Sequence, residues 1–292
     1  MRARVCGSPM PAVSVWGNTS GRASCVALAA AARKAFQRAQ NTSFWVPATK
    51  AESDIELEQF ALAVFWFHVE RLGWSREAIL RLGRAAGAEF WVQRRTSSMP
   101  RAERGINWHF DKDEDLLDDF GLTIHPLVAT VTYLSGSGAP LVVITKPTLD
   151  LGPDGATIQP LGPRTSAEAF VALPAPGRHV AFRGHLLHGC PSELEARRGE
   201  RLSLLVNIWL RHRPTGIRSI RSVMSNHHSK SKLGHVGAGL RRGAVPFTPK
   251  AEVKPIVVDE GVEEFPVTFG PWQVTGLRLP RELSTNSRGL WA

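Results

Sequence analysis

Apolar side chains recur at helical spacing after Ser53, and this pattern predicts the first long helix. Its apolar face combines positions three and four residues apart, which are Leu57, Phe60, Ala61, Val64, Phe67, His68 and Leu72. Ser53 or Asp54 is suited to cap its first turn. A second helix, "SREAILRLGRAAG", is predicted with Ser75 as its cap and an end near Gly87. Because His68 shares the apolar face, we predict a packed core histidine rather than a ligand.

Short apolar or alternating runs, separated by Gly and Pro, replace the helical pattern after the second helix. Such runs predict β-strands, here "AEFWVQ", "GINWHFD", "LVATVTYL", "PLVVIT", "AFVALP", "RHVAF" and "RLSLLVNIWL". A loop rich in Gly, Pro and Asp is predicted between Pro147 and Arg164. Two later runs, "FPVTF" and "QVTGLRLP", are predicted to complete the sheet. Helices followed by many strands indicate a mainly β fold, a sandwich or barrel with N-terminal helices packed outside.

The length of 292 residues, with 43% hydrophobic and 21% charged residues, is that of an ordinary globular protein. We predict a single domain over 51–292, with its core at about 88–210, a basic loop at about 211–250 and C-terminal strands at 251–292. The apolar run "CVALAAAA" is too short to span a bilayer, so no transmembrane helix is predicted. The three cysteines, Cys6, Cys25 and Cys190, are odd in number and unpatterned, which argues against a disulfide framework and a thiolate zinc site.

Two segments carry the positive charge. Residues 1–50 have seven Lys/Arg and residues 211–250 have nine, with no Asp/Glu in either, whereas the rest of the chain sums to −6. The first segment has the composition of an organelle transit peptide, and the alternative is a disordered start followed by an Ala-rich helix from about Ser24 to Gln40. For the second segment we favour a flexible surface loop over a contact with phosphate, nucleic acid or an acidic protein, because "RPTGIRSIRSVMSNHHSKSKLGHVGAGLRRG" has no aromatic residues to stack on bases.

The candidate chemistry begins in "INWHFDKDEDL". In an extended chain His109 and Asp111 point to the same side and can bind one metal ion together. A third ligand is offered by "RHVAFRGHLLHGCP", where His179 falls inside a strand and His185 in a loop, so we choose His188 at a strand end and keep His185 as the alternative. Two histidines and one carboxylate form the facial triad of non-haem Fe(II) oxygenases, which leaves other metal positions open.

The strand "RLSLLVNIWL" has one wholly apolar face, which we assign to an outer core layer. Its other face alternates polar and apolar side chains, in the order Arg201, Ser203, Leu205, Asn207 and Trp209. An arginine inside a barrel costs several kcal/mol unless it is paired, and no acid lies on this strand. A carboxylate ligand held by the guanidinium, with Ser203 as a further donor, would pair it.

The motifs His109-x-Asp111, His188-Gly and Arg201-x-Ser203, in this order, resemble the Fe(II)- and 2-oxoglutarate-dependent dioxygenases, and in particular the prolyl 4-hydroxylase-like branch. The resemblance covers roughly residues 88–210 and includes "LPAPGRHVAFRG". One departure is "GSGAPLVVI", where relatives often have Gly-Gly-x-Thr. The resemblance implies a double-stranded β-helix, and Fe(II) held by His109, Asp111 and His188.

The same resemblance implies that Arg201 pairs the far carboxylate of 2-oxoglutarate and that Tyr133 contacts this co-substrate. It also implies O2 as a reactant, ascorbate as a further cofactor, and hydroxylation of a C–H bond with decarboxylation of 2-oxoglutarate to succinate. The prime substrate, a protein residue or a small molecule, is not named by the sequence. The compartment is equally open, either cytoplasmic or, with a transit peptide, organellar.

Two other functional classes stay open. One is a cupin-like metalloenzyme without 2-oxoglutarate, which leaves Arg201 and Ser203 unexplained. The other is a catalytically silent protein that binds an acidic partner through the basic loop. Among the remaining polar residues, we expect His125 to be a strand-entry residue, Cys190 to be packing, and Gln93 and Asn207 to be candidates for the pocket wall. We expect the other acids to form a solvated loop, namely Asp113, Glu114, Asp115, Asp118 and Asp119, of which Asp113 is the first candidate to support the metal site or to contact substrate.

Overall fold

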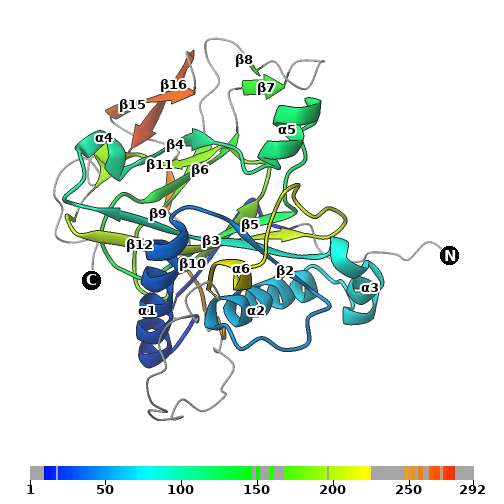
Figure 1. Ribbon diagram of the computed structural model, residues 1–292. Helices are drawn as coiled ribbons and strands as arrows, with labels where there is room; N and C mark the ends of the chain where they lie inside the picture. The colour runs from blue at the N-terminus through cyan, green and yellow to red at the C-terminus, as the bar shows by residue number, and fades with distance from the viewer. Residues whose placement is uncertain are drawn as a thin grey trace.

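Eight central strands pair with one another as nested antiparallel hairpins. Figure 1 shows how these strands are arranged in space. The computed structural model describes residues 10–17, 19–146, 149–151, 158–160, 168–195, 197–224, 247–249, 251–253, 256–258, 263–269 and 272–279. The innermost antiparallel pair is β6 with β9, followed outward by β5 with β10, β4 with β11 and β3 with β12. Their bounds are β3 Gly87–Thr96, β4 Ile106–His109, β5 Val128–Tyr133, β6 Leu141–Lys146, β9 Glu168–Ala172, β10 His179–Arg183, β11 His188–Cys190 and β12 Glu200–Trp209.

The nested pairs are distributed over two sheets, which is the arrangement of a jelly roll. The seven-stranded sheet has the order β13-β1-β10-β5-β12-β3-β2, and the five-stranded sheet has the order β14-β9-β6-β11-β4. Two short hairpins, β7 with β8 and β15 with β16, pair only with themselves. The added strands are β1 Val13–Gly17, β2 Phe44–Pro47, β7 Leu149–Leu151, β8 Ile158–Pro160, β13 Ala251–Val253, β14 Ile256–Val258, β15 Glu263–Phe269 and β16 Trp272–Leu279.

The inner core lies between the two sheets. Val131, Phe182 and Leu205 of the large sheet pack in one buried cluster with Leu141 and Val143 of the small sheet. Side chains that alternate along β12 therefore divide between this interior and the outer face of the large sheet. The double-stranded β-helix fold implied by the family resemblance is confirmed by this pairing.

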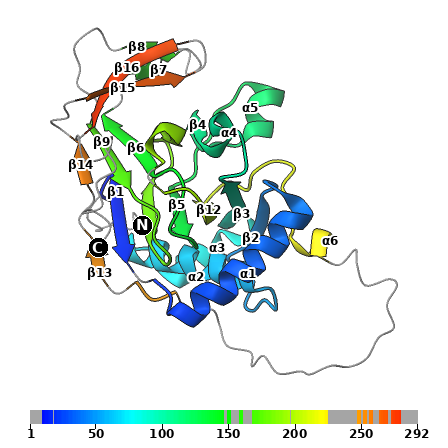
Figure 2. The same cartoon turned by 90° about the vertical axis from the view of Figure 1, so that its left-hand side faces the viewer.

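Helices cover the outer face of the large sheet (Figures 1 and 2). The apolar face of β12, which carries Leu202, Leu204, Val206 and Ile208, joins one buried cluster with residues of α1 and α2. This confirms the assignment of that face to an outer core layer. The helical segments are α1 Arg22–Ala39, α2 Glu56–Arg71, α3 Arg76–Arg81, α4 Arg101–Arg104, α5 Glu114–Phe120 and α6 Arg221–Met224, with single 3-10 turns at Gly83–Ala85 and Ser192–Leu194.

The N-terminal region is part of this architecture. Strand β1 pairs on both sides, with β10 and with β13. Helix α1 confirms the Ala-rich helix expected from about Ser24 to Gln40, and it buries Leu28, Ala32 and Ala35. Among the residues that the structure describes, no helix is both long enough and apolar enough to cross a membrane.

Several local predictions require correction. Helix α2 begins after Ile55, which makes no side-chain cap, and Ser53 instead accepts a hydrogen bond from the Ile55 backbone N–H. Ser75 does cap α3, accepting from Ala78 N at 3.2 Å, but this helix ends at Arg81, before a 3-10 turn. The runs "FPVTF" and "QVTGLRLP" are strands, yet they form a separate hairpin and do not extend either main sheet. The basic segment lies outside the described residues from 225 to 246.

Candidate functional site

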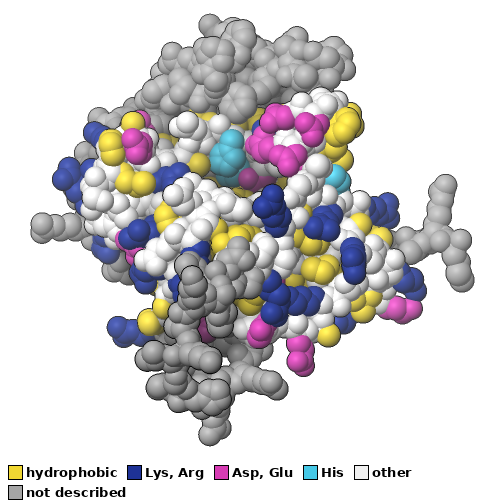
Figure 3. Space-filling view, viewed as in Figure 1, with side chains coloured by type: hydrophobic (Ala, Val, Ile, Leu, Met, Phe, Trp, Pro, Cys, Tyr) yellow, Lys and Arg dark blue, Asp and Glu magenta, His cyan; other side chains and the backbone are white. Residues whose placement is uncertain are grey.

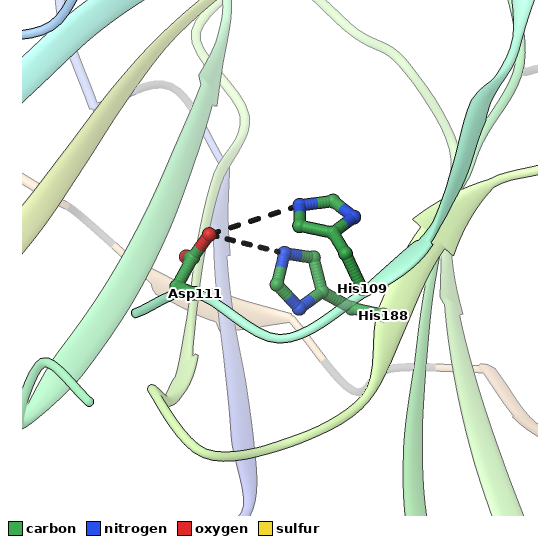
Figure 4. Close-up of side chains that lie close together, drawn as sticks. All are labelled: His109, Asp111 and His188. Carbon is green, nitrogen blue, oxygen red and sulfur yellow. Dashed lines mark ion pairs between the residues drawn. The ribbon is translucent and has the colours of Figure 1, made fainter. Parts of the chain in front are cut away.

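The nested pairing places two of the predicted metal ligands side by side. His109 ends β4 and His188 begins β11, and the antiparallel register pairs these two residues directly. Asp111 follows two residues later, in the loop after β4 rather than inside the predicted strand. The three side chains point toward one another (Figure 4), and their ligand atoms all lie within 4.8 Å of each other. The structure therefore brings together the residues that the sequence singled out.

Hydrogen bonds to backbone carbonyls fix the tautomer of both histidines. Nδ1 of His109 lies 2.7 Å from the oxygen of Asn107, and Nδ1 of His188 lies 3.0 Å from the oxygen of Leu186. A carbonyl oxygen only accepts hydrogen bonds, so Nδ1 carries the proton in each ring. Each Nε2 is then an unprotonated lone pair, and each lies 3.7 Å from Oδ1 of Asp111.

This donor set fits a divalent metal ion. Ligand atoms about 2.1 Å from one ion, at right angles to each other, are about 3 Å apart, so the two Nε2 atoms have less than 1 Å to move toward Asp111. Burial lowers the pKa of His188 to about 4, with a further decrease from His109 that partly offsets the increase from Asp111. His188 is therefore neutral at pH 7, as a metal ligand must be.

The competing histidines do not reach the site. His185 is exposed, on the turn before β11. His179 is buried in the outer layer, where its Nε2 lies 2.9 Å from Nε2 of His68 and its Nδ1 lies 2.7 Å from the hydroxyl of Thr132. This pair confirms the prediction that His68 is a packed core histidine.

Arg201 is buried on the inner face of β12 without an acidic partner in the described part of the chain. It is only 1% exposed, and its hydrogen bonds go to neutral groups. These are Ala139 O at 3.1 Å, Gln93 Oε1 at 2.7 Å, Ser203 Oγ at 3.2 Å and Cys190 Sγ at 3.1 Å. An uncompensated buried charge of this kind favours binding of an anionic group.

Gly138 packs closely against the side chain of Arg201. Gly138 has φ of +93°, and a Cβ added there would come within 2.4 Å of the Arg201 side chain. Tyr133 lies on the other side, with its ring 5.4 Å from the guanidinium carbon. Its hydroxyl donates to Ala172 O at 3.0 Å and accepts from Leu141 N at 2.9 Å, so its single proton is already used within the protein. Tyr133 therefore supports Arg201, and no proton remains for a ligand.

The acidic sequence after Asp111 is a helix rather than the predicted solvated loop. Asp113 caps α5, accepting from Leu116 N at 3.1 Å, and Gly121 ends the helix in the left-handed conformation. The second oxygen of Asp113 accepts from Thr215 N at 2.8 Å and from His212 Nε2 at 2.7 Å. Asp113 thus ties the segment after β12 to the start of α5, immediately beyond the ligand Asp111.

Sequence reasoning underestimated two polar residues near the site. His125 was expected only to enter a strand, but its Nδ1 lies 2.6 Å from the backbone oxygen of Asp111 and so holds the ligand loop. Glu89 was not singled out, although it is the acid on the face of "AEFWVQ" that the register pairs with Asn207. The usable signal was an acid at an alternating position of an otherwise apolar strand.

Comparisons with known proteins give structural neighbours only. No family model matches the sequence, and no curated protein matches it. A prolyl-4-hydroxylase from Pseudomonas putida is 17% identical with a TM-score of 0.41, and covers 69% of this chain and 93% of its own. The non-haem alpha-ketoglutarate-dependent epimerase SnoN, from nogalamycin biosynthesis, is 12% identical with a TM-score of 0.43, and covers 79% and 91%.

A third structural neighbour is similarly distant. Prolyl 4-hydroxylases from Phytophthora capsici are a further example, at 13% identity and a TM-score of 0.39, covering 74% of this chain and 65% of that one. Because all these identities and scores are low, we base the proposal below on the geometry of the site.

Proposed function

We propose that this protein is an Fe(II)- and 2-oxoglutarate-dependent dioxygenase. The observation that carries the proposal is the combination, inside one jelly roll, of a two-histidine, one-carboxylate set with a buried arginine that has no acidic partner among the described residues. Either feature alone fits other functions. Together they provide a place for a metal ion and a place for the carboxylate of a co-substrate that binds to it.

In this proposal His109, Asp111 and His188 hold Fe(II) on one side, which leaves the remaining positions for 2-oxoglutarate and O2. Arg201 and Ser203 bind the far carboxylate of 2-oxoglutarate, and Gln93 and Tyr133 hold Arg201 in place. A cupin-like enzyme without 2-oxoglutarate does not explain why Arg201 is buried unpaired. A silent binding protein does not explain the fixed tautomers of both histidines.

The bound iron, with 2-oxoglutarate and O2, supplies the oxidising chemistry, and the products are succinate, CO2 and a hydroxylated substrate. Hydrogen bonds from Nδ1 to backbone carbonyls orient His109 and His188, and burial keeps His188 neutral. Burial of His188, Asp111 and Arg201 keeps water away from the reacting atoms. The prime substrate is a protein residue or a small molecule, and ascorbate is proposed as an accessory reductant.

The test is optical. Anaerobic addition of Fe(II) and 2-oxoglutarate to the purified full chain is expected to give the weak visible charge-transfer band of the chelate, and His188→Ala is expected to abolish it. His185→Ala removes an exposed histidine three residues away and serves as the matched control, which should keep the band. A folded wild-type protein without the band would contradict the proposal.

A further inference from the structure

A second polar group lies on the inner face of the large sheet, further along β12 from Arg201. Glu89 of β3 is paired in register with Asn207 of β12, six residues beyond Arg201. Oε2 of Glu89 accepts from Trp209 Nε1 at 3.0 Å and faces Asn207 Nδ2 at 3.5 Å. The inner face of β12 thus carries a cation at its start and faces an acid near its end.

No cation balances this acid in the described part of the chain. The pKa of Glu89 is raised to about 7, by burial first and then by Asp111, while Trp209, Ser43 and Asn207 lower it as hydrogen-bond donors. No Lys or Arg is among the groups that shift it. A carboxyl group in such a place is stabilised either by a proton or by a cationic group that enters the site.

Asn207 supplies an independent sign that a ligand group is missing. Its side chain is 3% exposed, and its Oδ1 is buried without a hydrogen-bond partner. Buried amide oxygens are almost always paired, because an unpaired acceptor costs about 1–3 kcal/mol. Asn207 Oδ1 is therefore an unpaired acceptor beside the carboxylate of Glu89, whose donors Trp209, Ser43 and Asn207 are all neutral groups.

A cavity of about 410 Å³ leads to Glu89 and contains Ser43, Lys112 and Asp113 in its wall. Lys112 and Asp113 follow the candidate ligand Asp111 directly in the chain, so this part of the cavity wall begins one residue beyond it. Lys112 is paired with Glu114 at the rim, 3.0 Å away. Acidic side chains gather over α5, next to exposed histidine side chains (Figure 3). The cavity wall carries charges of both signs, with Arg38 and Arg218 beside the acids, so the preference for a cation rests on Glu89 and Asn207 themselves.

We propose that Glu89 and Asn207 bind a cationic nitrogen group, an ammonium or guanidinium, carried by the prime substrate. That the cation belongs to a substrate rests on the proposed dioxygenase function. The cation site itself is formed by Glu89 and Asn207 and does not depend on that function. A neutral amide would satisfy Asn207 and leave the carboxylate of Glu89 without a counter-charge. A cation with several N–H donors satisfies both acceptors at once.

The test compares small cations with neutral molecules of the same shape. Ligand-observed NMR titrations at low salt use methylguanidinium against methylurea, and n-butylammonium against 1-pentanol, with the full chain free of metal and 2-oxoglutarate. The wild-type protein is expected to bind each cation about ten- to a hundredfold more tightly than its neutral partner. Glu89→Gln keeps the side-chain shape and is expected to remove this preference.

Asp119→Asn is the matched control, because it removes one exposed acid of α5 that does not line the cavity. It is expected to keep the cation preference. Equal binding of cations and neutral partners by the wild-type protein, or a preference that survives in folded Glu89→Gln, would overturn the proposal. The optical band with Fe(II) and 2-oxoglutarate is read separately, so a lost dioxygenase function and a lost cation site give different results.

Discussion

Replacing Arg201 by Met separates its role in binding from its role in folding. The guanidinium is buried and has no acidic partner in the described residues, so the ligand-free protein carries its desolvation cost. Met fills a similar length without the charge, but it leaves Ala139 O and Gln93 Oε1 without their donor. The two effects oppose each other, and we expect the free energy of unfolding to change by less than about 2 kcal/mol.

The effect of Arg201→Met on 2-oxoglutarate should be much larger. Truncating one partner of a buried charge pair costs about 2–5 kcal/mol, which corresponds to about a 30- to 5,000-fold weaker Kd. At a 2-oxoglutarate concentration 100 times its Kd, the wild-type protein gains about 2.7 kcal/mol, or about 5 °C in Tm. The variant at the same concentration should gain at most about a third of this shift, because a Kd that is 30-fold weaker leaves about 0.9 kcal/mol.

Thermal unfolding with and without 2-oxoglutarate, in the presence of Fe(II) under anaerobic conditions, measures both quantities. Arg183→Met is the control, because Arg183 is partly buried and its side chain bonds to the backbone oxygen of Met10. It should keep the ligand-induced shift. A folded Arg201→Met protein that binds 2-oxoglutarate within about threefold of the wild type would refute the reasoning.

Three further predictions concern folding. Burial, with Arg71, lowers the pKa of His68 to about 3. Between pH 6.5 and 3 the unfolded chain therefore binds a proton at this residue that the folded chain does not bind. The free energy of unfolding should fall by about 1.4 kcal/mol per pH unit as the pH is lowered through this range. Urea titrations across this range should show a shallower dependence for His68→Gln, and an equal slope would contradict the assignment. Asp113→Ala should lower the free energy of unfolding by about 3 kcal/mol, from a lost helix cap and lost bonds to the segment after β12, whereas exposed Asp118→Ala should change it by less than about 0.5 kcal/mol in the same assay. Deletion of residues 1–40 removes β1 and α1, and should abolish cooperative unfolding followed by circular dichroism; a cooperative transition in the truncated chain would show that these elements are dispensable.

The strands of the core could be predicted from the sequence, because short apolar or alternating runs are a local pattern. Each of the seven predicted runs in the core region corresponds to a strand, and β12 divides its apolar and polar faces as alternation requires. The acidic stretch after Asp111 was wrongly predicted to be a loop, because its helical structure depends on the role of one side chain, Asp113. Asp113 caps the helix through a local bond from Leu116 N to its Oδ1, but its Oδ2 also accepts from Thr215 N, and the local sequence does not contain that second contact.

The candidate site likewise has features that the sequence predicts and features that only the tertiary structure shows. Alternation alone indicated that Arg201, Ser203 and Asn207 share one face, and the order of motifs indicated which histidine to choose. Only the nested antiparallel pairing, which joins β4 to β11 in register, brings His109 beside His188 and leaves His185 outside. The contact of Tyr133 with 2-oxoglutarate stays a prediction, and the structure adds that its hydroxyl donates to Ala172 O.

The sequence by itself determined most of the strands, the outer helices and the candidate residues for binding a metal and a carboxylate, because side-chain type and spacing express these directly. Tertiary structure alone decided which ligands meet, which hydrogen-bond partners fix their protons, and that Glu89 faces Asn207 with no cation among the described residues to balance it. The physical reason is that pairing between strands far apart in the chain sets these distances. Neither spacing nor composition encodes that register in a form that can be read locally.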